Sequence, residues 1–300
     1  MKNLDFIKRN KCPICNSFNS NEVAALKKDV IINYLNNYYG RGDFENLLIN
    51  YHYHLIKCKS CNFIYQLYVL DDESTKNFYE NIEKHNTNQK NKKNSYEKKN
   101  YKFVNFLKSK FFDNKRIDVL DFGSGYTKYP KKNESISFFT YDIATEGNDE
   151  NFTSFQDLKD KKFDIILLNQ VLEHVTDPSL IIRELQTYLK SNGILKIEFP
   201  SSNLINYKLF LMKIFGLKKN IIHEFFPIEH INCFSEKSIN ILFQNFSEIK
   251  INLKLFSLDQ NGSFLFKILK YFMIKNKFIK SIFTFLTLKN GGNYFLLKIK

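Results

Sequence analysis

Two C-x-x-C pairs near the start of the chain, Cys12/Cys15 and Cys58/Cys61, have the spacing of metal ligands. One tight turn can direct two thiolates at a single tetrahedral zinc ion, so two such turns supply four ligands. Because no ligand position then remains open, we expect a closed, structural site. Two paired turns favour zinc over a redox-active dithiol, and a reducing cytoplasm disfavours disulfides. The odd cysteine, Cys233, has apolar neighbours and is expected to be a buried free thiol.

The 42 residues between the two pairs exceed the spacing of roughly 15 to 20 residues in a compact zinc ribbon. We therefore expect an insertion, helical from Asn21 to Tyr39. The polar stretch from Asn81 to Asn100 is rich in Lys and Asn and predicts a linker or a solvated helix. These features divide the chain into a zinc-binding module at 1–70, a linker at 71–100 and a second domain at 101–300.

A second chemical signal is the sequence VLDFGSG at residues 119–125. A buried strand ends in Asp121, and a G-x-G turn follows, in which glycines let the backbone approach a ligand closely. A dinucleotide fingerprint would need a third glycine at the position of Lys128. The carboxylate of Asp121 suits a ligand with an ammonium group, and S-adenosylmethionine has that group and no phosphate. Asp142 ends the next predicted strand, where a carboxylate can accept hydrogen bonds from both ribose hydroxyls.

Strands and helices alternate from residue 101 onward, which predicts an α/β fold with a parallel sheet buried on both faces. Short apolar runs mark the strands, and apolar residues at helical spacing mark the helices. The predicted strands are 116–122, 136–143, 163–168, 194–199, 247–256 and 293–299, and the predicted helices are 101–112, 178–189 and 235–243. Asp177 and Ser235 are the expected N-caps. The dipeptide Asn192-Gly193 is expected to end the helix that begins at 178.

Four segments of this domain, VLDFGSG, FFTYDI, FDIILLNQVLEHVTDP and LKSNGILKIEFP, resemble the class I S-adenosylmethionine-dependent methyltransferases of the 11/23-like type. The segment EHINCFS at 229–235 adds to the resemblance, which covers about residues 101–300. The resemblance implies a Rossmann-like seven-stranded sheet with helices on both faces and an antiparallel last strand. The chain departs from the family at Thr127, where a third glycine is common.

The resemblance also implies a role for each cofactor-binding position. The glycine turn would hold the amino-acid end of the cofactor, the acid of the next strand the ribose, and its neighbour the adenine face. Two residues after the fourth strand would form the floor near the sulfonium. These positions are Asp121, Phe122, Gly123, Ser124, Gly125, Asp142, Ile143, Asn169 and Gln170.

Methyl transfer from a sulfonium is an in-line displacement, so it depends on the alignment of nucleophile and methyl group. A hydroxyl acceptor would also need a base. We expect His230 to be that base, because it follows the fifth strand at the carboxyl edge of the sheet, and His174 to be the next candidate. A structural role is the alternative for each histidine. The remaining candidates are His223, Glu224 and Glu229.

The formal net charge of +14 comes almost wholly from lysine, with arginine only at positions 9, 41, 116 and 183. Nucleic-acid binding is not favoured, because readers of phosphates and bases use the bidentate fork of arginine. The sequence CKSCNFIY resembles the zinc-ribbon leaders of bacterial methyltransferases associated with surface sugars or secondary metabolites. A small-molecule or glycan acceptor and O-methylation are therefore favoured. An RNA methyltransferase, whose zinc module grips nucleic acid, and a catalytically silent scaffold are the alternatives.

The first residues lack the apolar core of a secretory signal, so we expect a cytoplasmic protein. Residues 264–286 are apolar, but five lysines interrupt them and exclude a membrane span. Together with 204–222 they form amphipathic stretches, which predict lid insertions at about 201–234 and 260–288. Peripheral contact with an anionic membrane is the alternative to a lid.

Overall fold

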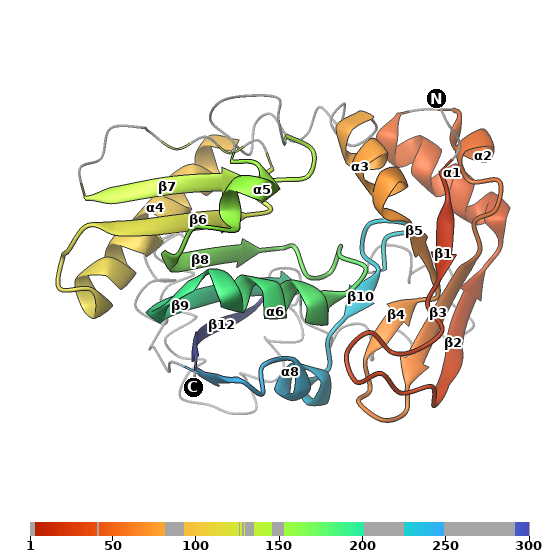
Figure 1. Cartoon of the computed structure of the whole chain (residues 1–300). Helices are drawn as coiled ribbons and strands as arrows, with labels where there is room; N and C mark the ends of the chain where they lie inside the picture. Colours follow the sequence, from red (N-terminus) through yellow and green to blue (C-terminus); the bar gives the residue numbers. More distant parts are fainter. Residues whose placement is uncertain are drawn as a thin grey trace, which may run out of the picture.

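The computed structural model describes residues 4–40, 42–81, 93–125, 127, 129, 135–145, 153–200, 225–248 and 292–299. Figure 1 shows two groups of elements: a large sheet with its helices, and a group of N-terminal strands and helices beside it. Within these ranges no helix is both long enough and apolar enough to cross a membrane.

The large sheet has the strand order β11-β12-β9-β8-β6-β7. Its strands are β6 (Ile117–Phe122), β7 (Ile136–Tyr141), β8 (Phe163–Asn169), β9 (Leu189–Pro200), β11 (Phe246–Glu248) and β12 (Gly292–Ile299). Strands β7, β6, β8 and β9 are parallel, and β12 runs antiparallel to both β9 and β11. The predicted α/β fold and the antiparallel last strand are confirmed. The described residues contribute six strands, and the expected seventh is not among them.

Helices cover both faces of this sheet, as the continuous apolar strands require. Helix α4 (Lys93–Phe111) packs through Val104 and Leu107 on one face. Helix α6 (Pro178–Tyr188) packs through Ile182 and Leu185 on the other, where α5 (Phe155–Leu158) also lies (Figure 1).

The two predicted N-caps are confirmed. The side chain of Asp177 accepts from the backbone of Leu180 at the start of α6. That of Ser235 accepts from the backbone of Ser238 at the start of α8 (Glu236–Leu242).

The predicted end of α6 is wrong. The helix ends at Tyr188, and Asn192-Gly193 lies inside β9. A Cβ at Gly193 would approach the carbonyl oxygen of Phe163 to 3.0 Å. The glycine therefore permits close pairing of β9 with β8, and it does not terminate a helix.

The N-terminal group contains a four-stranded sheet of order β10-β4-β3-β2 and a two-stranded pair, β1 with β5. Its elements are β1 (Phe6–Lys8), β2 (Ser20–Leu26), α1 (Lys28–Tyr39), α2 (Phe44–Leu47), β3 (Tyr53–Cys58), β4 (Ile64–Gln66), β5 (Tyr68–Leu70) and α3 (Asp72–Asn81). The helix predicted over 21–39 is correct only from Lys28, since β2 precedes it. Antiparallel pairing of β2 with β3 overrides the helical preference of the alanines in β2.

The two groups are joined more closely than a module and a linker would be. Strand β10 (Asn232–Cys233), from the C-terminal half, pairs with β4 of the N-terminal sheet. One continuous core contains Phe63 of the N-terminal group together with Phe199 and Phe234. The residues 71–100, expected to be a linker, include α3 and the first part of α4, and Asn100 is buried. The packing of α4 against the sheet explains why this polar stretch is not solvated throughout.

Parts of the predicted lids and linker lie outside the described residues. These parts are 82–92, 201–224 and 260–288, so the amphipathic stretches 204–222 and 264–286 fall outside as well. Residues 225–234 of the first predicted lid are described, and they lead into β10 and the N-terminal sheet.

Candidate functional site

The glycine turn after β6 lies at the edge where the parallel strands have their carboxyl ends, which is where ligands bind in such sheets. Both glycines have left-handed backbone conformations, with φ of 74° at Gly123 and 57° at Gly125. A Cβ at Gly123 would lie 2.3 Å from Cγ2 of Val171, in the loop after β8. The turn therefore needs a glycine here, because a neighbouring loop occupies the space of any side chain.

Asp121 is the second-last residue of β6 and is almost fully buried. Its Oδ2 accepts hydrogen bonds from the hydroxyl of Tyr129 at 2.6 Å and from Nδ2 of Asn100 at 3.4 Å. Burial raises the pKa of this carboxyl to about 6, and the nearby ammonium of Lys196 opposes the shift. The carboxylate that the sequence assigns to a cofactor ammonium is thus held by two residues that sequence reasoning missed.

Asp142 follows β7 and faces the same turn. Its Oδ2 accepts from the backbone N–H of Gly125 at 2.8 Å, and its Oδ1 accepts from that of Ala144 at 2.9 Å. Burial raises its pKa, while these two hydrogen bonds lower it. The structure therefore brings both predicted carboxylates to one edge and ties the second one directly to the glycine turn. Ser124 is buried in that turn, and Ile143 next to Asp142 is half-buried.

Asn169 and Gln170, at the end of β8, belong to a polar cluster on this edge. Gln170 has a left-handed backbone with φ of 54°, and its N–H donates to the carbonyl of Glu198 at 2.7 Å. The side chain of Asn169 accepts from the ammonium of Lys196 and lies 3.5 Å from that of Asn100. Lys196 also donates to Oε2 of Glu198 at 2.6 Å. The charged pair on β9 was missed, although a lysine and a glutamate in the otherwise apolar predicted strand 194–199 were a signal.

Two histidines meet beside this edge. The rings of His174 and His230 are 4.9 Å apart between centroids and nearly perpendicular. Nδ1 of His174 lies 3.1 Å from the hydroxyl of Tyr79 on α3, and its Nε2 lies 3.9 Å from Oε1 of Glu173. Burial, and then the proximity of His230, hold the pKa of His174 well below its usual value. The two histidines expected as bases are therefore adjacent, and His174 is held as a neutral imidazole.

Glu229 precedes His230 and is half-buried in the same loop. Its Oε1 accepts a hydrogen bond from the hydroxyl of Tyr39 at the end of α1, and burial raises its pKa to about 8. Tyr39 and Tyr79 both come from the N-terminal group, and sequence reasoning missed both. The other two candidate bases, His223 and Glu224, lie outside the described residues.

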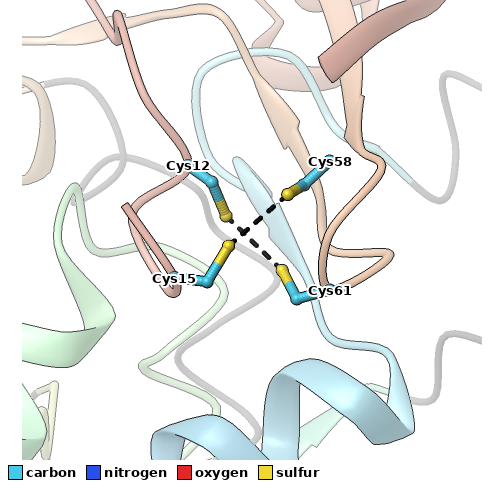
Figure 2. Close-up of side chains that lie close together, drawn as sticks. All are labelled: Cys12, Cys15, Cys58 and Cys61. Atoms are coloured by element: carbon cyan, nitrogen blue, oxygen red, sulfur yellow. Dashed lines mark hydrogen bonds between the residues drawn. The ribbon is translucent and has the colours of Figure 1, made fainter. Parts of the chain in front are cut away.

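The four cysteines of the C-x-x-C pairs converge, with their sulfur atoms directed at one another (Figure 2). Sγ of Cys12 lies 3.6 Å from that of Cys61, and Sγ of Cys15 lies 3.5 Å from that of Cys58. Zinc–sulfur bonds of about 2.3 Å in a tetrahedron place sulfur atoms about 3.8 Å apart, so the arrangement fits a single zinc ion. Cys233 is buried, as expected, and does not belong to this cluster.

The cysteine cluster touches the elements that carry the histidines. The hydroxyl of Ser235 donates to the carbonyl of Cys61 at 2.6 Å, and that of Ser179 donates to the carbonyl of Pro13 at 2.8 Å. The buried guanidinium of Arg9 donates to Oδ1 of Asn232 and to the carbonyl of Ile231, each at 2.8 Å. The loop that contains His230 is thus hydrogen-bonded to the N-terminal group through Arg9 and through the carbonyl of Cys61.

Comparisons with known proteins give a family for the chain. The profile of the family described as "Methyltransferase domain" matches residues 92–246, just over half of the chain. No curated protein matches. Among solved structures, magnesium protoporphyrin IX methyltransferase (ChlM) from Synechocystis PCC 6803 is 20% identical, with 60% of this chain and 91% of that chain covered and a TM-score of 0.41.

Two further structures illustrate the range of similar proteins. The plantazolicin methyltransferase BamL is 15% identical, with 66% of this chain and 82% of that chain covered and a TM-score of 0.38. Coclaurine N-methyltransferase is 13% identical with a TM-score of 0.32, and the match spans 50% of this chain and 50% of that chain's length. On the family match, the chain belongs to the methyltransferase-domain family and is an S-adenosylmethionine-dependent methyltransferase.

Proposed function

We propose that this enzyme methylates a small molecule that must lose a proton to become a nucleophile, with a hydroxyl of a sugar or secondary metabolite as the first candidate. The adjacent imidazoles of His174 and His230 carry the proposal. A buried, neutral imidazole can take a proton from an acceptor, whereas an acceptor that is already nucleophilic needs no such group. O-methylation of a glycan or related metabolite is the specific form that we favour.

The cofactor is proposed to bind along the glycine turn. Asp121 would face the ammonium of the methionine end, while Asp142 would accept from the ribose hydroxyls. Asn169 and Gln170 would lie under the sulfonium, on the side of the histidines. In this arrangement the protein contributes mainly by aligning the acceptor with the methyl group. The remaining turn positions, Phe122 to Gly125, and Ile143 would complete the contacts.

The zinc ion is proposed to be structural. Four thiolates would close its coordination, and the ion would supply folding energy to the N-terminal group without taking part in the transfer. The ion would hold the two cysteine turns, whose carbonyls at Cys61 and Pro13 accept from Ser235 and Ser179, and in this way it would help to fix the loop of His230.

The test is the release of S-adenosylhomocysteine from S-adenosylmethionine in the presence of a panel of nucleotide-linked sugars and hydroxylated metabolites, with bulk tRNA as the competing probe. We expect turnover with a member of the small-molecule panel and none with tRNA. Replacing both imidazoles, in the double variant His174→Ala/His230→Ala, should abolish turnover and leave binding of S-adenosylhomocysteine within about twofold, since neither ring belongs to the glycine turn. Turnover with tRNA, together with a salt-dependent gel shift, would support the RNA alternative. Failure of the wild-type chain to bind S-adenosylhomocysteine would support the scaffold alternative.

A further inference from the structure

Glu173 is a buried carboxyl group with an unusual environment. Its relative exposure is 2%, and neither carboxylate oxygen has a hydrogen-bond partner. Buried polar groups are nearly always hydrogen-bonded, because an unpaired one is destabilising by about 1–3 kcal/mol. We therefore looked for the role of this unpaired carboxyl group in the residues that surround it.

The neighbour of Glu173 is the ring of His174. Oε1 of Glu173 lies 3.9 Å from Nε2, while Nδ1 on the other side of the ring lies 3.1 Å from the hydroxyl of Tyr79. The imidazole of His174 therefore lies between a carboxylate and a hydroxyl, which is the order by which a buried acid orients a base and the base activates a hydroxyl. Such contacts are often long without ligands and shorten in the complex.

The backbone fixes this arrangement relative to the second histidine. The carbonyl of Glu173 accepts from the N–H groups of Ile231 at 2.8 Å and of Asn232 at 3.2 Å. His230 immediately precedes these residues, so the backbone of Glu173 is hydrogen-bonded to the segment that contains His230. Glu173, His174 and Tyr79 therefore lie next to His230, where we propose that the acceptor loses its proton.

The proposed reaction creates a positive charge at this point. When an acceptor proton reaches His174, an imidazolium forms in a buried site beside the ring of His230, and both features disfavour that charge. A carboxylate within ion-pair distance of the ring compensates for it. Glu173 is placed to do this, and its oxygens are not engaged elsewhere.

We propose that Glu173 is a positioning residue for acceptor deprotonation: its carboxylate accepts the Nε2–H of His174, so that Nδ1 receives the proton that Tyr79 relays from the acceptor. The inference rests on the proposed function. The acceptor gives up a proton and gains the methyl group, and the sulfonium becomes the neutral thioether of S-adenosylhomocysteine. The proton leaves the His174 and Glu173 pair after product release.

The pair is sensitive to pH. Burial, and to a lesser extent the nearby carboxylate of Glu198, raises the pKa of Glu173 to about 8. The other titratable groups facing this site are His174, His230, Tyr79 and Glu229. Below about pH 8 the protonated carboxyl would donate to Nε2, and His174 would carry its proton on Nδ1. Above that pH the ionised carboxylate would accept from Nε2–H, and Nδ1 would be free to accept.

The experiment measures the tautomer of His174 by ¹⁵N NMR in the full-length, zinc-loaded chain with saturating S-adenosylhomocysteine. The His174→Gln variant assigns the signals. We expect His174 to change from the Nδ1–H to the Nε2–H form as the pH rises through about 8. Glu173→Gln should abolish this change, and Glu45→Gln, at an exposed position on α2, should preserve it.

Absence of the change in the wild-type chain between about pH 6.5 and 9.5 would overturn the proposal without reference to any variant. The proposal would also be overturned if the His174 tautomer in Glu173→Gln changed with pH as it does in the wild-type chain. Metal analysis of the same samples should give one zinc ion per chain; a second equivalent that Glu173→Gln removes would make Glu173, His174 and His230 a metal site and overturn the relay. Binding of S-adenosylhomocysteine to the wild-type chain, measured separately, tests the proposed function and not this inference.

Discussion

The two sides of the carboxyl edge are built in different ways. On the side where we propose that the cofactor binds, the cofactor side, Asp121, Gly123 and Asp142 are bonded mainly to their own turn and to adjacent strands. On the side where we propose that the acceptor binds, the acceptor side, His174 and Glu229 are bonded to tyrosines of the N-terminal group, Tyr79 and Tyr39. The first side is a property of the sheet, while the second depends on how two groups of elements pack. Changes to the N-terminal group should therefore affect the two sides unequally.

Loss of zinc should give the largest difference between the sides. We expect Cys61→Ser to lower the melting temperature by more than 10 °C, because a structural zinc ion contributes roughly 10 kcal/mol of binding free energy in small domains. The contacts of Tyr79 and Tyr39 with the acceptor side should be lost, so methyl transfer should fall at least 100-fold. Binding of S-adenosylhomocysteine should weaken by less than about tenfold.

Zinc content, thermal unfolding and calorimetry on the same protein check this prediction. Cys233→Ser is the matched control, since it removes a buried thiol that is not part of the cluster. If calorimetry showed that both sides lose function in proportion, the two groups would form one cooperative unit. The shared core of Phe63, Phe199 and Phe234 is the feature that would explain such a result.

The buried carboxyl of Glu229 should make stability depend on pH. Its pKa is about 8 in the folded chain against an ordinary value of 4.5. Below pH 4.5 both states are protonated. Between 4.5 and 8 the unfolded chain releases the proton while the folded chain retains it, so the free energy of unfolding falls as pH rises. Above 8 the loss is complete.

Glu229→Gln should therefore unfold at the same denaturant concentration as the wild type near pH 4 and at a higher one near pH 8. The difference should reach a few kcal/mol, at about 1.4 kcal/mol for each unit of pKa shift. Glu45→Gln, at an exposed position, should show no such trend. A constant difference across this range would show that Glu229 titrates normally in the folded chain.

The cofactor side could be predicted from sequence because its residues lie close together in the chain. A strand, an acid and a G-x-G turn specify the position of Asp121, and one β-α-β step specifies that of Asp142. The partners of these residues were not predictable in the same way. Asn100 lies in a stretch that reads as polar linker, and it is buried only because α4 packs on the sheet.

The acceptor side shows more clearly what local sequence patterns cannot predict. His174 and His230 were identified as candidates, but no local pattern indicates that their rings meet. Tyr79 and Tyr39 lie 95 and 190 residues from their partners in the sequence, and packing of the N-terminal group brings them there. The start of β2 was missed for a related reason, because pairing with β3 decides its conformation.

Gly123→Ala should affect the cofactor side alone. The new Cβ would lie 2.3 Å from Val171, at a φ of 74° that alanine disfavours. Overpacking and backbone strain together should cost about 3 kcal/mol, which is a loss of roughly 100-fold in affinity for S-adenosylhomocysteine by calorimetry. Gly125→Ala is the matched control. An alanine at position 125 would have a strained backbone but no clash, so the affinity for S-adenosylhomocysteine should fall about fivefold. Equal losses would mean that Val171 moves aside without effect.

Ser235→Ala should produce the smallest effect and the most specific one. Ser235 caps α8, and its hydroxyl also donates to the carbonyl of Cys61, so it connects the helix after the His230 loop with the cysteine cluster. Ser154 caps α5 by the same kind of bond and has no contact with the cluster. Each alanine variant should lose about 1 kcal/mol of stability, because each loses a cap. Only Ser235→Ala should also speed the release of zinc to a chelator, because the carbonyl beside Cys61 then loses its donor. If both variants released zinc at the wild-type rate, the bond from Ser235 would serve the helix alone, and the acceptor loop would be held to the N-terminal group through Arg9 and β10.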